Sequence, residues 1–333
     1  MSRKLTIKMK ALRFVKKHKK NTTRHTLLAT SVILFLLVMF PVGHFLMVKS
    51  EAPPENNQNK FTASFAGDMV FNSYYDKSVE KGRAEKISSY LQGYLATSDY
   101  TTGSINGSIT DKETELLKDF NFDTVDIYNE TQNDIKVLDD KGILYVGSNV
   151  AAENKIVYQE MNGIKTATIG TSEGKYVASL QKIKEAKLNA NLVVVHVNWK
   201  EKYDNHVSDN QRSIAKAISD AGADIILGHG TEVLEPIEIF NGTIIMYSLG
   251  NFLHGEMYAT TNDGALIQYM IGQDGYSESL RVVPLSLAYG RPQPALGFID
   301  GLNRNNIFKV LTRELPDYVN WTVDNGILNI PLN

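Results

Sequence analysis

The stretch from Asn191 to Phe252 decides the fold that this sequence predicts. Residues 191–199 are NLVVVHVNW, residues 221–229 are AGADIILGH, and residues 246–252 are MYSLGNF. The first two segments are apolar, β-branched runs that each lead into a loop carrying His, Asn or carboxylate side chains. Open α/β sheets place their binding groups at the carboxyl ends of such strands. We therefore predict an α/β fold with a site in this stretch.

Strand and helix patterns alternate before this stretch, and hairpin patterns follow it. An alternating strand begins at Phe61, and the pattern ends it at Gly67-Asp68. Asn162-Gly163 and Asn241-Gly242 each join two apolar runs, and a third turn of this kind lies at Asp324-Asn-Gly326. This order predicts a mixed sheet, or two packed sheets, covered by helices.

Charge divides the chain into a basic N-terminal segment and an acidic remainder. Residues 1–50 hold eleven Lys or Arg and no Asp or Glu. The whole chain holds 35 basic and 37 acidic residues, so residues 51–333 keep 24 basic against 37 acidic, a net charge of −13. No cysteine occurs, which excludes disulfides, thiolate chemistry and cysteine-ligated metals. The acidic body must therefore rely on its packed core for stability.

An apolar segment long enough to cross a membrane follows most of the basic residues. Leu27–Val48 is LLATSVILFLLVMFPVGHFLMV, twenty-two residues without a formal charge. A helix rising about 1.5 Å per residue would span a hydrocarbon core of ~30 Å over this length. A cleaved signal peptide is the alternative, but its apolar middle is usually ~7–15 residues and precedes a small-residue cleavage site. The sequence favours an uncleaved transmembrane anchor.

The basic residues also predict the orientation of this anchor, because positive charge stays on the cytoplasmic side. We expect a basic cytoplasmic tail at residues 1–26, an anchor at 27–48, a polar stalk at 49–60 and an extracellular domain at 61–333. The predicted location is the plasma membrane, crossed once. Topology and anionic lipid explain a basic tail beside a span, so no nucleic-acid partner is expected.

Three motifs of the acidic body resemble a known family. They are Phe65-Ala-Gly67-Asp68-Met69, residues 221–229, and Tyr247-Ser-Leu-Gly-Asn251-Phe252. In sequence and order they resemble the CapA family of poly-gamma-glutamate capsule synthesis proteins, from about Phe61 to about Val283. The resemblance implies a four-layer α/β/β/α sandwich similar to calcineurin-like metallophosphatases. It also implies partners among the ligase and membrane subunits that make and export the polymer, and the polymer itself is a candidate partner.

The same resemblance implies metal-ligand positions, and several of them differ in this sequence. Asp68 matches the first ligand of the family. The family's Asn-Leu-Glu aligns with Ser104-Ile-Asn106, and its Asn-Asn-His aligns with Tyr128-Asn129-Glu130. Its His-Trp-Gly aligns with Asn198-Trp199-Lys200, with His196 two residues earlier on the same strand face. Its Gly-His-His-Pro-His aligns with Gly228-His229-Gly230-Thr231-Glu232.

Six metal-ligand candidates and three other site candidates follow from this comparison. The metal candidates are Asp68, Asn129, Glu130, Asn198, His229 and Glu232, and the others are Asn106, His196 and Asn251. Replacing His by Glu shifts preference toward Mg²⁺, Mn²⁺ or Ca²⁺, so we expect Mn or Mg, or no metal. Glycines on both sides of His229 would let a ligand approach closely. No catalytic residue is assigned, because a two-metal hydrolase needs a nearly complete ligand shell.

Functions of different classes are consistent with this sequence. The first is a membrane-anchored, non-catalytic accessory component of poly-gamma-glutamate capsule synthesis or export. The second is an extracellular metal-dependent phosphoesterase or related hydrolase. A third interpretation is a cell-envelope scaffold that only binds partner proteins, through its span and stalk. The altered ligand positions favour the first.

Overall fold

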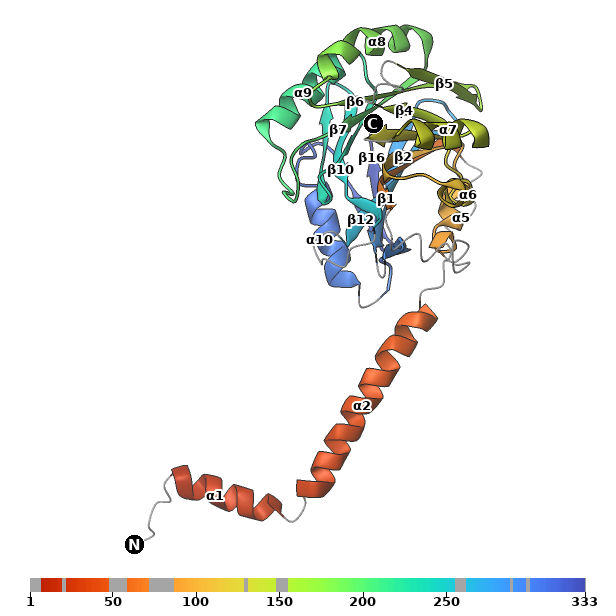
Figure 1. Cartoon of the computed structure of the whole chain (residues 1–333). Coiled ribbons are helices and arrows are strands. Elements are labelled where there is room, and N and C mark those ends of the chain that lie inside the picture. Colours follow the sequence, from red (N-terminus) through yellow and green to blue (C-terminus); the bar gives the residue numbers. More distant parts are fainter. Residues whose placement is uncertain are drawn as a thin grey trace. The chain divides into compact units, whose positions relative to one another are not determined.

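The chain forms two units in the computed structural model. The described residues are 7–19, 22–47, 59–71, 87–128, 131–147, 155–254, 262–287, 290–297 and 300–332. One unit comprises Met1–Lys49 and the other Ser50–Asn333. The first unit contains helices α1 (Ile7–His18) and α2 (Thr22–Met47) (Figure 1).

The predicted membrane anchor falls largely on α2. Within the described ranges, no helix combines the length and the apolar character that crossing a membrane requires. The anchor therefore stays a prediction from the sequence.

The larger unit is built on two mixed β-sheets. In the part of the chain that the structure describes, the first sheet has ten strands: β1 (Asn59–Phe71), β2 (Tyr100–Gly107), β3 (Thr124–Tyr128), β4 (Leu144–Gly147), β11 (Asn251–Leu253), β12 (Asp263–Gly272), β13 (Glu278–Ser286), β14 (Gln293–Pro294), β15 (Thr322–Asp324) and β16 (Ile327–Pro331). Its main order is β15-β16-β13-β12-β1-β2-β3-β4, with β11 beside β1 and β14 beside β13. Strands β1 to β4 run parallel, whereas the strands from β12 to β15 pair antiparallel.

The second sheet has six strands among the described residues. They are β5 (Ile156–Met161), β6 (Ile164–Ser172), β7 (Leu192–Asn198), β8 (Ile225–His229), β9 (Leu234–Phe240) and β10 (Thr243–Leu249). The order is β5-β6-β7-β8-β10-β9, with a parallel centre and antiparallel edge strands. Strand β7, LVVVHVN, is buried along its whole length, as expected of a parallel strand covered on both faces.

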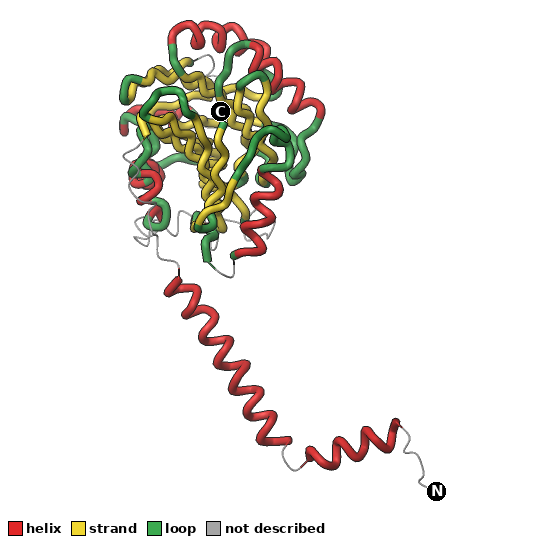
Figure 2. Tube along the Cα trace, turned by 180° about the vertical axis from the view of Figure 1, so that it is seen from behind, coloured by secondary structure: helices red, strands yellow, loops and turns green. Residues whose placement is uncertain are grey.

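Helices cover the outer face of each sheet. They are α5 (Gln92–Leu95), α6 (Asp111–Asp119), α7 (Gln132–Lys141), α8 (Tyr176–Asn189) and α9 (Asp209–Asp220). Helix α10 (Gly301–Leu311) instead packs Ile307, Phe308 and Leu311 against residues of both sheets. Helices α6 and α7 share a hydrophobic cluster with the ten-stranded sheet, and α8 and α9 share another with the six-stranded sheet. A third cluster, which includes Phe65, Val194 and Ile267, fills the space between the sheets. Figure 2 shows the strands at the centre and helices outside them, so the expected α/β fold with two packed sheets is confirmed.

Strand β1 is longer than the predicted strand at both ends. It begins at Asn59, inside the segment predicted as stalk, because Asn59 pairs with Gly272 of β12. It also continues through Gly67-Asp68 to Phe71, where the pattern predicted an end. Pairing with β2 shifts register between Phe65 and Asp68, and such a bulge breaks the alternation without ending the strand.

The connection between β10 and β11 carries the chain from the six-stranded sheet to the ten-stranded sheet. Gly250 makes this turn with a φ of 66°, a left-handed conformation that suits glycine. The backbone N–H of Asp68 donates to the Gly250 carbonyl at 3.0 Å. Strand β11 then pairs with β1, which places Asn251 beside Asp68. The MYSLGNF motif therefore joins the two sheets next to the predicted site.

All three hairpins predicted from Asn-Gly pairs are confirmed. They join β5 to β6, β9 to β10 and β15 to β16. In each turn both the Asn and the Gly have positive φ. This is the type I′ geometry that matches the twist of the flanking strands.

Candidate functional site

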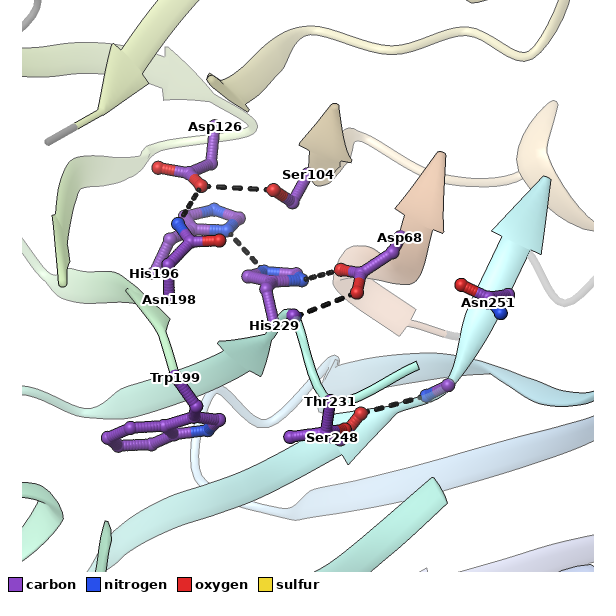
Figure 3. Close-up of polar contacts among 12 residues, drawn as sticks. Asp68, Ser104, Asp126, His196, Asn198, Trp199, His229, Thr231, Ser248 and Asn251 are labelled. Atoms are coloured by element: carbon purple, nitrogen blue, oxygen red, sulfur yellow. Dashed lines mark hydrogen bonds and ion pairs between the residues drawn. The ribbon is translucent and has the colours of Figure 1, made fainter. Parts of the chain in front are cut away.

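A group of buried polar side chains lies between the two sheets (Figure 3). We call it the inter-sheet polar cluster, and it consists of Asp68, Thr102, Ser104 and Asp126 from the ten-stranded sheet and His196, Asn198 and His229 from the six-stranded sheet. Alternation along β7 puts His196 and Asn198 on the same face, as predicted. The cluster is closed to solvent, since His196 is 0% and His229 1% exposed.

Two histidines of the six-stranded sheet link two residues of the other sheet. His196 Nε2 lies 3.0 Å from Thr102 Oγ1, and its Nδ1 lies 2.9 Å from His229 Nε2. His229 Nδ1 lies 2.8 Å from Asp68 Oδ1, and Asp68 Oδ2 accepts the backbone N–H of Gly230 at 2.8 Å. The imidazole rings are stacked, with centroids 5.1 Å apart. Hydrogen bonds thus run without a break from Thr102 to Asp68.

One arrangement of protons satisfies this whole chain of contacts. An Asp68 carboxylate accepts from Nδ1–H of His229, whose Nε2 then accepts from Nδ1–H of His196. His196 Nε2 in turn accepts the hydroxyl proton of Thr102. Burial, followed by the neighbouring His229, holds the pKa of His196 well below its ordinary value of 6.5, which favours the neutral ring. In this arrangement every ring nitrogen of the pair already has a partner.

Asp126 lies beside the histidine pair and is also buried. Its Oδ2 accepts from Asn198 Nδ2 at 2.7 Å and from Ser104 Oγ at 3.0 Å. Its Oδ1 has no hydrogen-bond partner among the described residues and packs against Gly170, where a Cβ would lie 2.5 Å away. Burial raises the pKa of Asp126 to about 6, opposed by His229 and the two donors. Burying a carboxyl group in a protein core costs free energy, so Asp126 differs from the apolar side chains that fill a core.

Two predicted site residues lie near the inter-sheet polar cluster but outside its hydrogen-bond chain. Glu232 forms an ion pair with Lys202, and its Oε2 lies 3.8 Å from Nε2 of His254. Asn251 lies beside Asp68 in the sheet, and its amide donates to the backbone carbonyl of Glu232 at 3.3 Å. Both residues therefore hold the loop after β8 in place.

The remaining predicted residues are not placed in the cluster. Asn106 is exposed near the end of β2. Asn129 and Glu130 lie outside the described residues.

The glycines on both sides of His229 make room for Trp199. A Cβ on Gly228 would lie 1.9 Å from the carbonyl oxygen of Tyr247 and 2.2 Å from Nε1 of Trp199. That indole nitrogen donates to the same carbonyl at 2.8 Å. The backbone N–H of Trp199 also donates to the His229 carbonyl at 2.9 Å. This packing accounts for Gly228, and the expectation that the glycines admit a ligand stays a prediction.

The described residues, as placed, do not fit a two-metal centre. Both ring nitrogens of His196 and of His229 and both oxygens of Asp68 are engaged in hydrogen bonds. Among the described side chains, no group of three or more His, Cys, Asp or Glu residues could hold a metal ion. A cation at His229 would have to displace either Asp68 or His196. Metal ligation by the predicted residues stays a prediction.

Three members of the inter-sheet polar cluster were missed by the sequence analysis. Thr102 and Ser104 alternate along β2, and Asp126 is a charged residue inside the apolar strand β3. A carboxylate at an inward-facing position of a buried strand is the signal that could have identified Asp126.

These features define the class of protein: a two-sheet α/β protein with a closed polar cluster between its sheets. The family model for the bacterial capsule synthesis protein PGA_cap matches residues 130–256. The PGA biosynthesis protein CapA of Bacillus subtilis (strain 168) is 32% identical over 381 residues, which cover all of this chain and 98% of the relative. The capsule biosynthesis protein CapA of Bacillus anthracis is 30% identical over 388 residues, which cover all of this chain and 92% of the relative. The chain belongs to the CapA family of capsule synthesis proteins.

A comparison with solved structures gives a weaker likeness. TT1561 of Thermus thermophilus aligns with a TM-score of 0.38 at 7% identity, covering 61% of this chain and 92% of that chain. A likeness at this level carries no information on function.

Proposed function

We propose that the protein is a membrane-anchored, non-catalytic component of the machinery that makes or exports a poly-gamma-glutamate capsule. The observation that carries this proposal is the match along the whole chain to two Bacillus proteins named for PGA and capsule biosynthesis. The proposed partners are the ligase and membrane subunits of that machinery, with the polymer as a further candidate.

The proposed anchor is the uncharged segment Leu27–Val48, with the basic tail in the cytoplasm and residues 61–333 outside the cell. This orientation follows from the ten basic residues that precede the segment. It places the acidic body on the side of the plasma membrane where a capsule is assembled.

The geometry of the inter-sheet polar cluster supports a non-catalytic role. Catalysis on a polymer requires groups that the substrate can reach, whereas His196 and His229 are buried and hydrogen-bonded at both nitrogens. In a hydrogen-bonded network of this kind each group stabilises its neighbour, and removing one member leaves a buried polar atom unsatisfied, at a cost of about 1–3 kcal/mol. The cluster thus joins the two sheets.

Complementation of a deletion strain tests this proposal. We expect deletion to reduce the amount or surface retention of capsule polymer, and the native chain to restore it. Asp68→Asn keeps the shape of the side chain, so a non-catalytic protein carrying it should restore the capsule wherever it still folds. Protein level and melting temperature of the variant provide the control for folding. An unchanged capsule after deletion would remove the proposed role.

An extracellular metal-dependent phosphoesterase is the second candidate. Two observations favour it. Asp68 contacts His229 between the sheets. The layers follow the order helix, sheet, sheet and helix, which is similar to calcineurin-like metallophosphatases. The discriminating measurement is the metal content of the purified body together with turnover of a generic phosphodiester under added Mn²⁺. A folded Asp68→Asn protein that neither turns over the diester nor restores the capsule would favour this candidate over the first.

A further inference from the structure

Helix α1 presents large apolar side chains to solvent on one face. Ile7, Phe14 and Val15 are 88%, 65% and 61% exposed. They are spaced i, i+7 and i+8, so they lie along one side of the helix. Leu12, 61% exposed, extends this apolar face.

The other face of α1 is basic. Lys10, Arg13 and Lys17 are spaced i, i+3 and i+7, and Lys16 lies next to them on the helix surface. Residues 1–50 contain no acidic side chain that could neutralise these charges. Lys8 lies within the apolar face, between Val15 and Leu12, where its long stem can still carry the ammonium group to water. Met9, 49% exposed, lies between Lys16 and Arg13 on the basic side. The helix is therefore amphipathic and strongly cationic.

We propose that α1 lies in the interface of an anionic lipid surface, with Ile7, Phe14 and Val15 among the acyl chains and the basic face at the headgroups. An apolar face opposite a Lys- and Arg-rich face is the composition that binds in the plane of such an interface. Each basic residue near an anionic surface strengthens binding roughly fivefold. Helix α2, which carries most of the predicted anchor, begins four residues after α1 ends. An anchor in α2 would therefore hold α1 near the membrane surface.

A nucleic acid is the other polyanion that a basic helix could bind. Nucleic-acid binding uses the basic residues and leaves exposed Ile, Phe and Val without a role, because the phosphate backbone offers no apolar phase. A lipid interface uses both faces of α1. The charge and the apolar face together favour lipid.

The chain has no cysteine, so a single introduced cysteine reports one position of α1 in the full-length protein. Val15→Cys and Lys17→Cys, each labelled with bimane, form a matched pair from the two faces. The labelled protein is reconstituted in vesicles of phosphatidylcholine with and without phosphatidylglycerol, whose acyl chains carry bromine as quencher. We expect the label at position 15 to lose fluorescence only when phosphatidylglycerol is present, and the label at position 17 to keep it.

A charge variant and a flotation control complete the experiment. The charge variant adds three substitutions to the Val15→Cys protein: Lys10→Glu, Arg13→Glu and Lys17→Glu. It should abolish the quenching, because negative side chains repel the anionic lipid. Flotation shows separately that the protein is bound to the vesicles. Three outcomes would overturn the proposal. The first is protein that floats with the vesicles but shows no quenching at position 15, and the second is equal quenching at positions 15 and 17. The third is quenching at position 15 that is equal with and without phosphatidylglycerol. So would a fluorescence response to added RNA and none to vesicles. The outcome does not depend on the role in capsule synthesis.

Discussion

At the scale of single residues, Glu235 is a buried carboxyl that connects strand β9 to helix α9. It is 1% exposed, and its Oε2 accepts from Nε2 of Gln211 at 2.9 Å. Gln211 also closes the capping box of α9, because its Oε1 accepts the backbone N–H of Ser208 at 2.9 Å. Burial raises the pKa of Glu235 to about 8, against the hydrogen bond from Gln211.

This side chain should make the stability of the protein depend on pH. Its folded pKa of about 8 is above the reference value of 4.5, so the folded state binds the proton more tightly. The resulting stabilisation is complete below about pH 4.5 and is lost as pH rises through about 8. Glu235→Gln keeps the contact with Gln211 but cannot titrate, so it should remove this loss, which is at most about 5 kcal/mol. Urea unfolding at a series of pH values gives the free energy of unfolding of both proteins.

The matched control is Glu160→Gln, because Glu160 lies on edge strand β5 of the same sheet, away from the buried core. We expect this variant to keep the pH dependence of the native protein. If Glu235→Gln also kept it, Glu235 would not be the group responsible.

The inter-sheet polar cluster shows which side chains the sequence could predict. The spacing of His196 and Asn198 placed both on one face of a strand, and the resemblance grouped Asp68 with His229. Asp126 was missed because its partners Ser104 and Asn198 are 22 and 72 residues away along the chain. Such contacts depend on how two sheets face each other, which periodicity within one strand does not encode.

At the scale of elements, the fit of β1 against the β10–β11 connection depends on Gly67. A Cβ at this position would lie 2.0 Å from the carbonyl oxygen of Gly250, so one of the two backbones must move. That carbonyl also accepts the backbone N–H of Asp68 at 3.0 Å. Gly67→Ala should therefore lower the free energy of unfolding by about 3 kcal/mol, measured by thermal or urea denaturation.

Gly174→Ala provides the comparison for this substitution. Gly174 is exposed in the turn before α8, and a Cβ added there would have no other atom within 4 Å. We expect its stability to stay close to that of the native protein. An equal loss in both variants would mean that the contact with Gly250 is not the cause.

The elements also differ in how well the sequence predicted them. Hairpins were predicted correctly because an Asn-Gly pair selects a turn whose geometry is local. The end of β1 was predicted wrongly because its last residues are held by β2 and β11, strands that lie far away in the sequence. A turn can be predicted from one short segment, whereas the length of a strand depends on the strands with which it pairs.

At the scale of the whole molecule, charge separates the two units. Residues 50–333 form one compact unit, and this body carries a net charge of −13. Poly-gamma-glutamate is itself a polyanion near neutral pH, since its free carboxyl groups are ionised. The net field of the body should therefore oppose direct contact with the polymer.

This repulsion predicts an unusual salt dependence for the isolated body. Proteins that bind polyanions through basic residues lose affinity as salt rises. Here added salt screens the repulsion, because the screening length falls from ~30 Å at about 0.01 M to ~8 Å at about 0.15 M. We expect residues 50–333 to bind labelled polymer more weakly at the lower salt concentration, as measured by fluorescence anisotropy. The full chain, with eleven further basic residues ahead of the body, should bind more tightly than the body at low salt. Tightest binding of the isolated body at low salt would instead require a local basic patch that outweighs the net charge.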